Sequence, residues 1–132
     1  MMRLAAVMVG IAAGACGAGP VHLTELERAK SGTLQVVLLS DHDALRHGKD
    51  TFFIEFRADP GGTLMDVGTV KATASMPMPG MPMFGGIDVR HSDLPGRYAA
   101  TGEFSMAGRW RIAVEWDGPA GRGSVSFSGS VQ

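Results

Sequence analysis

From residue 33 onward, apolar and polar residues alternate in seven short segments, and this alternation narrows the range of folds open to the chain. The clearest segment is RWRIAVEW (109–116), in which every second residue from Trp110 to Trp116 is apolar. Successive side chains of a β-strand point to opposite faces, so a period of two indicates a strand with one face in the core. The other six segments are residues 33–40, 50–57, 67–76, 86–92, 97–104 and 123–131.

The chain has 132 residues, among them 19 glycines and 7 prolines, which suits one domain of short strands joined by turns. The sequence therefore predicts an all-β domain over residues 33–132, specifically a seven-stranded immunoglobulin-like antiparallel β-sandwich. Tyr98 stands just after the turn DLPG and is expected to form a tyrosine corner, in which its hydroxyl ties the turn to the strand. Trp110 is expected at the centre of the core.

Residues 1–15 are typical of an export signal. A positive MMR start precedes the apolar run LAAVMVGIAAGA, which is too short to cross a bilayer as a helix. The run ends directly before Cys16, the only cysteine, and this arrangement resembles a bacterial lipoprotein signal whose cysteine becomes lipidated. Ala13 stands where such signals usually carry leucine, so the alternative is cleavage after residue 15 and a soluble secreted protein. In both cases we expect the mature protein to work in the periplasm or cell envelope.

Residues 16–32 are expected to form a tether between the signal and the domain. The segment GAGPVH, directly after Cys16, contains glycine and proline and suits a flexible connection. The following segment, LTELERAKSG, could hold one helical turn, with Thr24 as the N-cap, Glu27 as its capping-box partner and Gly32 as the stop.

The segment MPMPGMPMFGG, residues 76–86, holds four of the nine methionines. Proline has no backbone N–H, so the three prolines keep their part of the segment out of a hydrogen-bonded ladder, while Gly80 permits a sharp bend. Methionine is a common filler of protein cores, and Met76 continues the inward face of the preceding predicted strand. Four thioethers within eight residues, each beside a proline, nevertheless favour a site for a soft metal ion.

The order of the strands gathers further metal donors around this segment. Consecutive antiparallel strands run in opposite directions, so the connections after the first, third and fifth predicted strands share one end of the sandwich. Thioether sulfur suits Cu(I), and imidazole suits copper in either oxidation state. The predicted ligands at this end are Met76, Met78, Met81, Met83, Met106, His42 and His47. For the two histidines, the alternative is a solvent-exposed side chain without a metal.

The segments ASMPMPGMPMFGG and DLPGRYAATGEFSMAGRWRIAVEWDG resemble the YtkA-like (FixH-related) domain family. The shared pattern is a Met-Pro segment, a P-G-x-Y turn and an aromatic-x-M-x-G-x-W stretch, here at Met76–Met83, Pro95, Gly96, Tyr98, Phe104, Met106, Gly108 and Trp110. The resemblance implies a small extracytoplasmic β-sandwich that handles copper or heavy metals and occurs alone, as a lipoprotein, or attached to efflux and oxidase-assembly proteins. It supplies no catalytic residue, and it does not extend to His42 or His47.

The residues favour a protein that is not an enzyme, since the sequence has no G-x-S-x-G, no H-E-x-x-H and no phosphate-binding loop. A net charge of −1 without a basic stripe gives no reason to expect nucleic acid as a partner. We therefore expect an envelope-anchored Cu(I) carrier or metallochaperone. Its expected partners are the membrane, through a lipid anchor, and a metal-efflux or haem–copper oxidase assembly protein. The alternative is an interaction module whose Met-Pro loop docks on such a complex without a metal.

Lipidation of Cys16 makes a prediction about where the protein is found. Replacing the cysteine (Cys16→Ser) removes the only thiol to which a lipid could be attached, so the variant should remain unprocessed or become soluble. Fractionation of cells, with the membrane and soluble fractions probed separately, measures this. Wild-type protein found wholly in the soluble periplasmic or culture fraction would contradict the lipid anchor.

Overall fold

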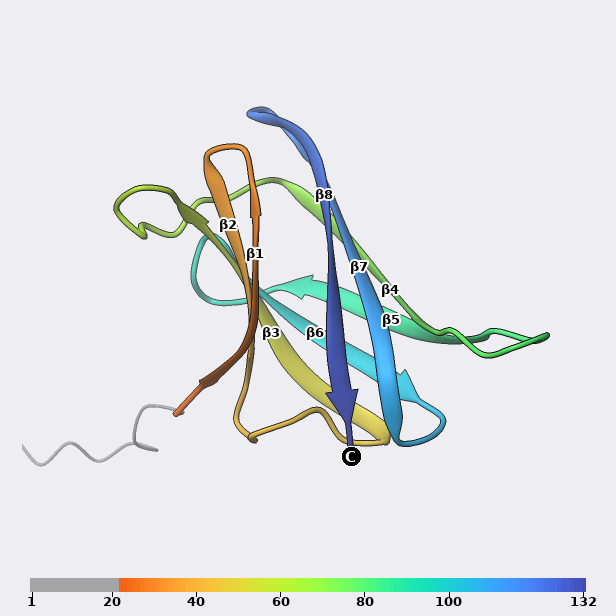
Figure 1. Cartoon of the computed structure of the whole chain (residues 1–132). Helices are drawn as coiled ribbons and strands as arrows, with labels where there is room; N and C mark the ends of the chain where they lie inside the picture. Colours follow the sequence, from red (N-terminus) through yellow and green to blue (C-terminus); the bar gives the residue numbers. More distant parts are fainter. Residues whose placement is uncertain (1–21) are drawn as a thin grey trace, which may run out of the picture.

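The computed structural model describes residues 22–132 of the chain. The predicted signal peptide and the predicted lipidation site at Cys16 concern residues outside this range. The described residues contain no helix, and hence none that is long and apolar enough to cross a membrane. They form eight strands (Figure 1), which are β1 (Thr24–Ser31), β2 (Leu34–Ser40), β3 (Gly48–Ala58), β4 (Thr69–Met76), β5 (Met83–His91), β6 (Arg97–Phe104), β7 (Gly108–Gly118) and β8 (Gly121–Val131).

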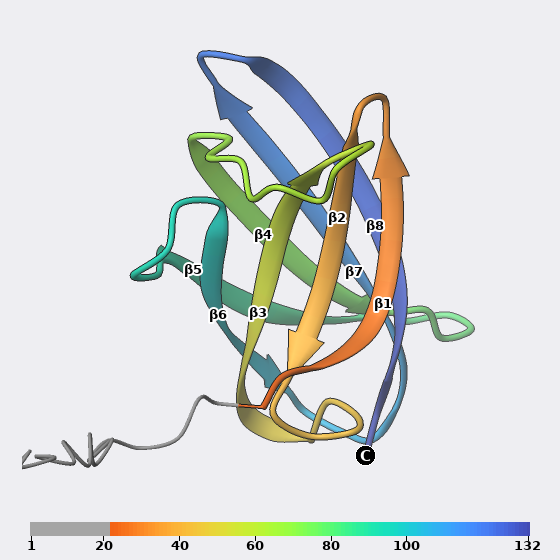
Figure 2. The ribbon, with the colours of Figure 1, turned by 90° about the vertical axis from the view of Figure 1, so that its left-hand side faces the viewer.

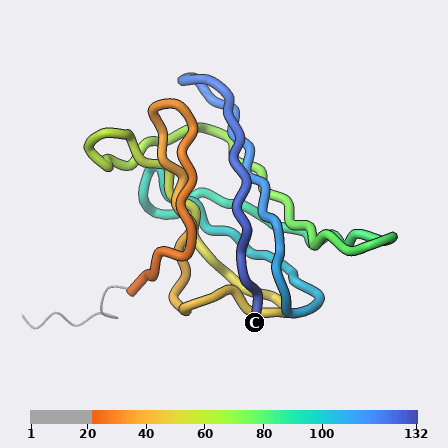
Figure 3. Tube along the Cα trace, in the orientation of Figure 1, coloured from red at the N-terminus to blue at the C-terminus, as the bar shows by residue number. Residues whose placement is uncertain are grey.

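All eight strands belong to one antiparallel sheet in the order β1-β2-β3-β6-β5-β4-β7-β8. The sheet curls until β1 lies beside β8 and encloses the core almost as a barrel (Figures 1, 2 and 3). The prediction of an all-β antiparallel fold is confirmed, but the seven-stranded immunoglobulin-like sandwich is wrong in the number of strands and in their layering. A sandwich and a curled sheet require the same alternation of residues, and only long-range pairings, such as β3 with β6, distinguish them.

The additional strand is β1, in the segment where the sequence predicts a helical turn capped by Thr24, and that prediction is wrong. The register of β1 with β2 shifts at Leu26, which forms a bulge. Because of this extra residue, Leu26 and Ala29 both pack against the core although they are three residues apart, a spacing that also suits a helix. Gly32, with a φ of 57°, forms the two-residue turn that joins β1 to β2 rather than ending a helix.

In the strands whose alternation predicts an inward face, that face is turned toward the core. In β7, every second residue from Trp110 to Trp116 is buried, and in β4 the same holds from Val70 to Met76. The strand predicted at residues 86–92 begins earlier, at Met83. The core is completed by further apolar side chains from the other strands, chiefly Val36, Leu38, Phe52, Ile54, Phe56, Tyr98, Phe104 and Phe127.

The connection between β2 and β3 covers the seam where the sheet fails to close. Leu45 from this connection is buried and forms a bridge with Val131 at the end of β8. The main-chain N–H of Gln132 donates to the oxygen of Leu45 at 2.7 Å, and the N–H of His47 donates to the oxygen of Gln132 at 2.7 Å. These contacts hold the connection against the free edge of β8.

Tyr98 hydrogen-bonds as a corner tyrosine, although its partners lie in the β3–β4 connection rather than in its own turn. Its hydroxyl lies 2.9 Å from the main-chain oxygen of Gly68 and 3.1 Å from Oδ1 of Asp66, and it accepts from the N–H of Val67 at 3.3 Å. Burial, together with the Asp66 carboxylate, raises the pKa of Tyr98 to about 12. The phenol therefore stays protonated and keeps this connection tied to β6.

Glu55 lies on the face of β3 that the alternation predicts to be exposed, yet its side chain is only 2% exposed. Its two oxygens bind two arginines: Oε1 accepts from Nε of Arg57 at 3.0 Å, and Oε2 accepts from Nη2 of Arg97 at 2.6 Å. Burial raises the pKa of Glu55, but the hydrogen bonds and charges of the two arginines outweigh it and hold the pKa below its usual value. The ionised carboxylate thus stabilises the pairing of β3 with β6.

Trp110 provides a test of the core. The indole is 1% exposed, packs edge-on against Phe104, and donates from Nε1 to the main-chain oxygen of Met106 at 3.0 Å. Trp110→Ala should lower the free energy of unfolding by about 3–5 kcal/mol, since it leaves a large cavity and removes a hydrogen bond. Chemical denaturation measures the change, and Arg109→Ala, an exposed neighbour on the same strand, should cost less than about 0.5 kcal/mol. Equal stability of both variants would contradict the position of the core.

Glu55 predicts how stability depends on pH. A carboxyl group whose pKa is lower in the folded than in the unfolded state makes its full contribution to stability at a pH above its unfolded-state pKa, which is about 4.3 for glutamate. This contribution is lost as the pH falls through the folded-state pKa. Glu55→Gln should therefore be less stable than the wild type at pH 7, and the difference should shrink as the pH falls below about 4.3. Urea unfolding between pH 3 and 7 measures this. Glu103→Gln, at an exposed site, should leave the wild-type profile unchanged. If the free energies of unfolding of Glu55→Gln and of the wild type change with pH in parallel, Glu55 does not have this role.

Candidate metal centre on the methionine hairpin

The strands β4 and β5 form a hairpin whose tip projects from the body of the molecule (Figures 1 and 2). The ladder between β5 and β6 begins only at Ile87, whereas β4 and β5 stay paired as far as Met76 and Met83. The tip, residues 77–82, contains the three prolines and lies outside both strands, as the sequence predicts. Gly80 makes the predicted bend with a φ of 85°, in the left-handed region that favours glycine.

Met76 and Met83 are direct partners across the base of the hairpin. Directly opposed residues of an antiparallel pair share one face of the sheet, and here that face is the core. Met76 is buried, and Met83 is half-buried against the core. The terminal methyl group of Met76 packs so closely on Gly108 that a side chain there would clash. The base of the hairpin therefore adjoins the turn between β6 and β7.

The other three predicted methionine ligands are open to solvent. Met78 and Met81 lie on the hairpin tip and are 41% and 78% exposed. Met106 lies in the β6–β7 turn, two residues before Gly108, and is 41% exposed. Since Gly108 contacts Met76, the turn that holds Met106 adjoins the base of the hairpin, while Met78 and Met81 lie on its tip.

The two predicted histidine ligands lie in the β2–β3 connection and have partners of their own. Nε2 of His42 lies 3.2 Å from Oδ1 of Asp41. Nδ1 of His47 lies 3.0 Å from the main-chain oxygen of Gln132. Because this oxygen accepts, the neutral tautomer that suits the contact has its proton on Nδ1, and in that tautomer Nε2 can bind a metal. Within residues 22–132, neither histidine forms a hydrogen bond with a methionine.

The donor chemistry of this end of the molecule is therefore dominated by sulfur. Within residues 22–132, no three His, Cys, Asp or Glu side chains come together as a set that could hold a metal ion. Thioethers do not titrate, so a site built from them would bind a soft ion such as Cu(I) independently of protonation. A hard divalent ion such as Mg²⁺ or Ca²⁺ needs several oxygen ligands, which the hairpin does not offer.

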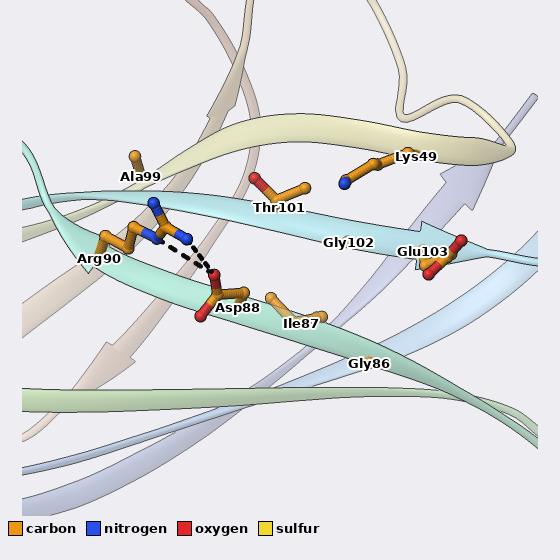
Figure 4. Close-up of a pocket in the computed structure, with 9 residues that line it drawn as sticks. All are labelled: Lys49, Gly86, Ile87, Asp88, Arg90, Ala99, Thr101, Gly102 and Glu103. Atoms are coloured by element: carbon orange, nitrogen blue, oxygen red, sulfur yellow. Dashed lines mark hydrogen bonds and ion pairs between the residues drawn. The ribbon is translucent and has the colours of Figure 1, made fainter.

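An open hollow on the outer face of β3, β5 and β6 lacks such donors (Figure 4). Its floor contains small residues, including Gly86, and charges of both signs surround it. Arg90 is paired with Asp88 at 3.1 Å and is largely solvent-exposed. Because the lining contains no sulfur and no imidazole, this hollow is not a continuation of the methionine site.

Phe84 is an exposed aromatic side chain of the hairpin that is not among the predicted metal ligands. It is 77% exposed on the outer face of β5, opposite to the face of Met83. The sequence did contain a signal, since continuing the alternation of the strand backwards from Ile87 through Met83 places Phe84 outward.

Comparison with solved structures finds proteins that share the fold of this chain. FetP from uropathogenic Escherichia coli strain F11, expressed recombinantly in the periplasm, matches with a TM-score of 0.55 at 12% identity, over 83% of this chain and 95% of FetP. A copper-bound variant of FetP matches with a TM-score of 0.50 at 10% identity, over 82% of this chain and 97% of the variant. At these identities the likeness shows the fold alone. No curated protein matches the sequence.

The sequence pattern of the YtkA-like family matches residues 28–115, which is more than half of the chain. The matched range includes the methionine hairpin, the Tyr98 turn and the Trp110 strand, the three segments on which the resemblance was based. The chain therefore belongs to the YtkA-like family.

Proposed function

We propose that this protein binds copper as Cu(I) through the thioethers of the methionine hairpin and carries it within the cell envelope. The observation that carries the proposal is the arrangement of five methionines at one place in the fold. Met76 and Met83 are paired at the base of the hairpin, Met106 stands in the adjoining turn, and Met78 and Met81 are exposed at the tip.

The ligands divide into an inner and an outer group. Met83 and Met106 are the partly accessible sulfurs nearest the base of the hairpin, and Met76, although it is part of the core, lies directly beside them. Met78 and Met81 would meet an arriving ion first, since they are the most accessible. A carrier has to release its ion as well as bind it, and uncharged thioethers on an exposed tip suit such an exchange. His47, with Nε2 free, is the imidazole that could add a further ligand.

The likeness to FetP supports copper as the metal and the envelope as the location. A structure of a FetP variant is described as copper-bound, and another FetP was expressed in the periplasm. We extend both properties to this chain as part of the proposal, together with the lipid anchor at Cys16 and the absence of catalytic activity. A metal-efflux or haem–copper oxidase assembly protein is the partner that such a carrier would serve.

A second function, docking on a membrane complex without a metal, is favoured by Phe84. This side chain is 77% exposed and offers no donor to a metal ion, so copper binding does not account for it.

Replacing Met78, Met81 and Met83 together by leucine separates the two functions. Leucine keeps the volume and apolarity of methionine, a swap that usually costs under about 1.5 kcal/mol, but it removes the soft donors. The triple variant should fold normally. It should lose Cu(I) at a concentration of competing chelator at least about tenfold lower than the wild type, which corresponds to a loss of about 1.4 kcal/mol in binding free energy. Docking through shape and hydrophobicity should be unaffected.

The measurement is the amount of Cu(I) retained by the reduced, untagged protein during titration with the chelator. Met65→Leu is the matched control, because Met65 is 39% exposed and lies in the β3–β4 connection, away from the hairpin. The copper proposal fails if the wild type holds no more Cu(I) than the triple variant, or if Met65→Leu loses as much.

A further inference from the structure

The hairpin has a second property that copper binding does not use, namely an uncharged apolar surface at its projecting end. Between Lys71 and Asp88 the sequence contains no charged residue and no histidine. Three apolar side chains of this segment are exposed, at Met78, Met81 and Phe84. The tip reaches away from the sheet (Figure 1), so these side chains do not lie against the rest of the domain.

Two arginines stand behind this apolar end on the outer face of the sheet. Phe84 pairs with Ser75, and Ser75 pairs with Arg111, so the three form one outward row across β5, β4 and β7. Neighbouring strands are about 4.8 Å apart, which puts Phe84 and Arg111 roughly 10 Å from one another on the same face. Arg109 precedes Arg111 on this face, and both line a hollow beside Pro77.

These arginines are free to meet an anion. Within residues 22–132, neither Arg109 nor Arg111 forms an ion pair with a carboxylate. Three acidic residues on the outer face lie nearest this end. Glu103 on β6 stands opposite Lys49, Asp88 on β5 is already paired with Arg90, and Glu115 on β7 comes four residues after Arg111. The outer face at the hairpin end is therefore apolar at its tip and positive behind it.

We propose that this face binds the surface of a lipid bilayer, with Met78, Met81 and Phe84 in the outer part of the acyl region and Arg109 and Arg111 at the lipid phosphates. Apolar and aromatic side chains ahead of basic ones are the arrangement by which proteins lie on a membrane interface. The neutral tip needs no anionic lipid for insertion, whereas the arginines add attraction to phosphate.

A protein partner fits this surface less well. A stable protein–protein interface buries about 800 Å² on each side and involves about 20–30 residues. The hairpin end offers three large exposed apolar side chains on a narrow projection, which is too little for a stable interface of this size and leaves room only for a small, transient docking contact. Insertion into a bilayer requires no matching surface, because each apolar side chain contributes separately by leaving water.

The test uses the full chain with a tryptophan placed at one end of β5 or at the other, and asks which of the two meets lipid. Phe84→Trp reports on the hairpin, and Leu94→Trp is the matched control, since Leu94 is 40% exposed in the β5–β6 connection at the other end of these strands. Vesicles of phosphatidylcholine and phosphatidylglycerol carry bromine at a shallow position of the acyl chains. Both variants have the same N-terminal segment, so a difference between them reports the position of the added tryptophan.

The added tryptophan of Phe84→Trp should be quenched at least about twofold more than that of Leu94→Trp, after subtraction of the signal from Trp110 and Trp116, which are buried in both. Bromine near the headgroup should quench more than bromine near the chain ends, because the insertion is shallow. Equal quenching of the two variants, or none, overturns the proposal. Protection of the tryptophan at position 84 without lipid, rising with protein concentration, overturns it in favour of a second copy of the chain.

Two further variants test the charges and separate membrane contact from copper binding. The double variant Arg109→Gln/Arg111→Gln should reduce the quenching in the Phe84→Trp background. Lys71→Gln/Arg122→Gln, which removes the same charge elsewhere on the outer face, should not. In the same background, replacing Met78, Met81 and Met83 by leucine should leave the quenching of the tryptophan at position 84 unchanged, since leucine keeps the apolar surface. If leucine abolishes the quenching, sulfur rather than hydrophobicity holds the face, and the membrane proposal fails.

Discussion

The insertion of the β4–β5 hairpin into the middle of the sheet is the pairing on which the rest of the structure depends. β5 pairs with β6 and β4 pairs with β7, so this hairpin joins the half made of β1, β2, β3 and β6 to the half made of β7 and β8. The ladder with β6 starts at Ile87, and four residues of β5 before it pair with β4 alone. The hairpin that closes the core is therefore also the one that projects, and its exposed tip extends from a buried base.

This dual position explains why the methionines differ in environment although the sequence spaces them alike. The pleat turns Met76 and Met83 inward, where Met76 is buried and packs on Gly108. The prolines end the ladder, so Met78 and Met81 have no inward face to follow and remain exposed. A single segment thus supplies both a core contact and soft donors, and a metal bound there would be coupled to the packing of the sheet.

Copper binding and membrane contact would use different atoms of the same hairpin. Copper would bind sulfur, whereas a bilayer would take up the hydrocarbon of the methionines and the ring of Phe84, with arginines behind them. The two roles fit together physically, because a carrier whose donors lie at a membrane surface would be close to membrane-embedded partners. Two other polar clusters hold the fold together. Glu55 joins β3 to β6 through Arg57 and Arg97, and the hydroxyl of Tyr98 fixes the β3–β4 connection.

The sequence by itself determined the strands, their inward faces, the bend at Gly80 and the family, because these depend on neighbours along the chain or on local backbone chemistry. It misled at β1, where Thr24, Glu27 and Gly32 match the capping and stop signals of a helix although pairing with β2 makes the segment a strand. Only the tertiary structure decided that the strands form one curled sheet, that Glu55 is buried between two arginines, and that Phe84 and Arg111 share a face. Each of these depends on pairing between strands far apart in the sequence, and alternation within a strand carries no information about which strand lies beside it.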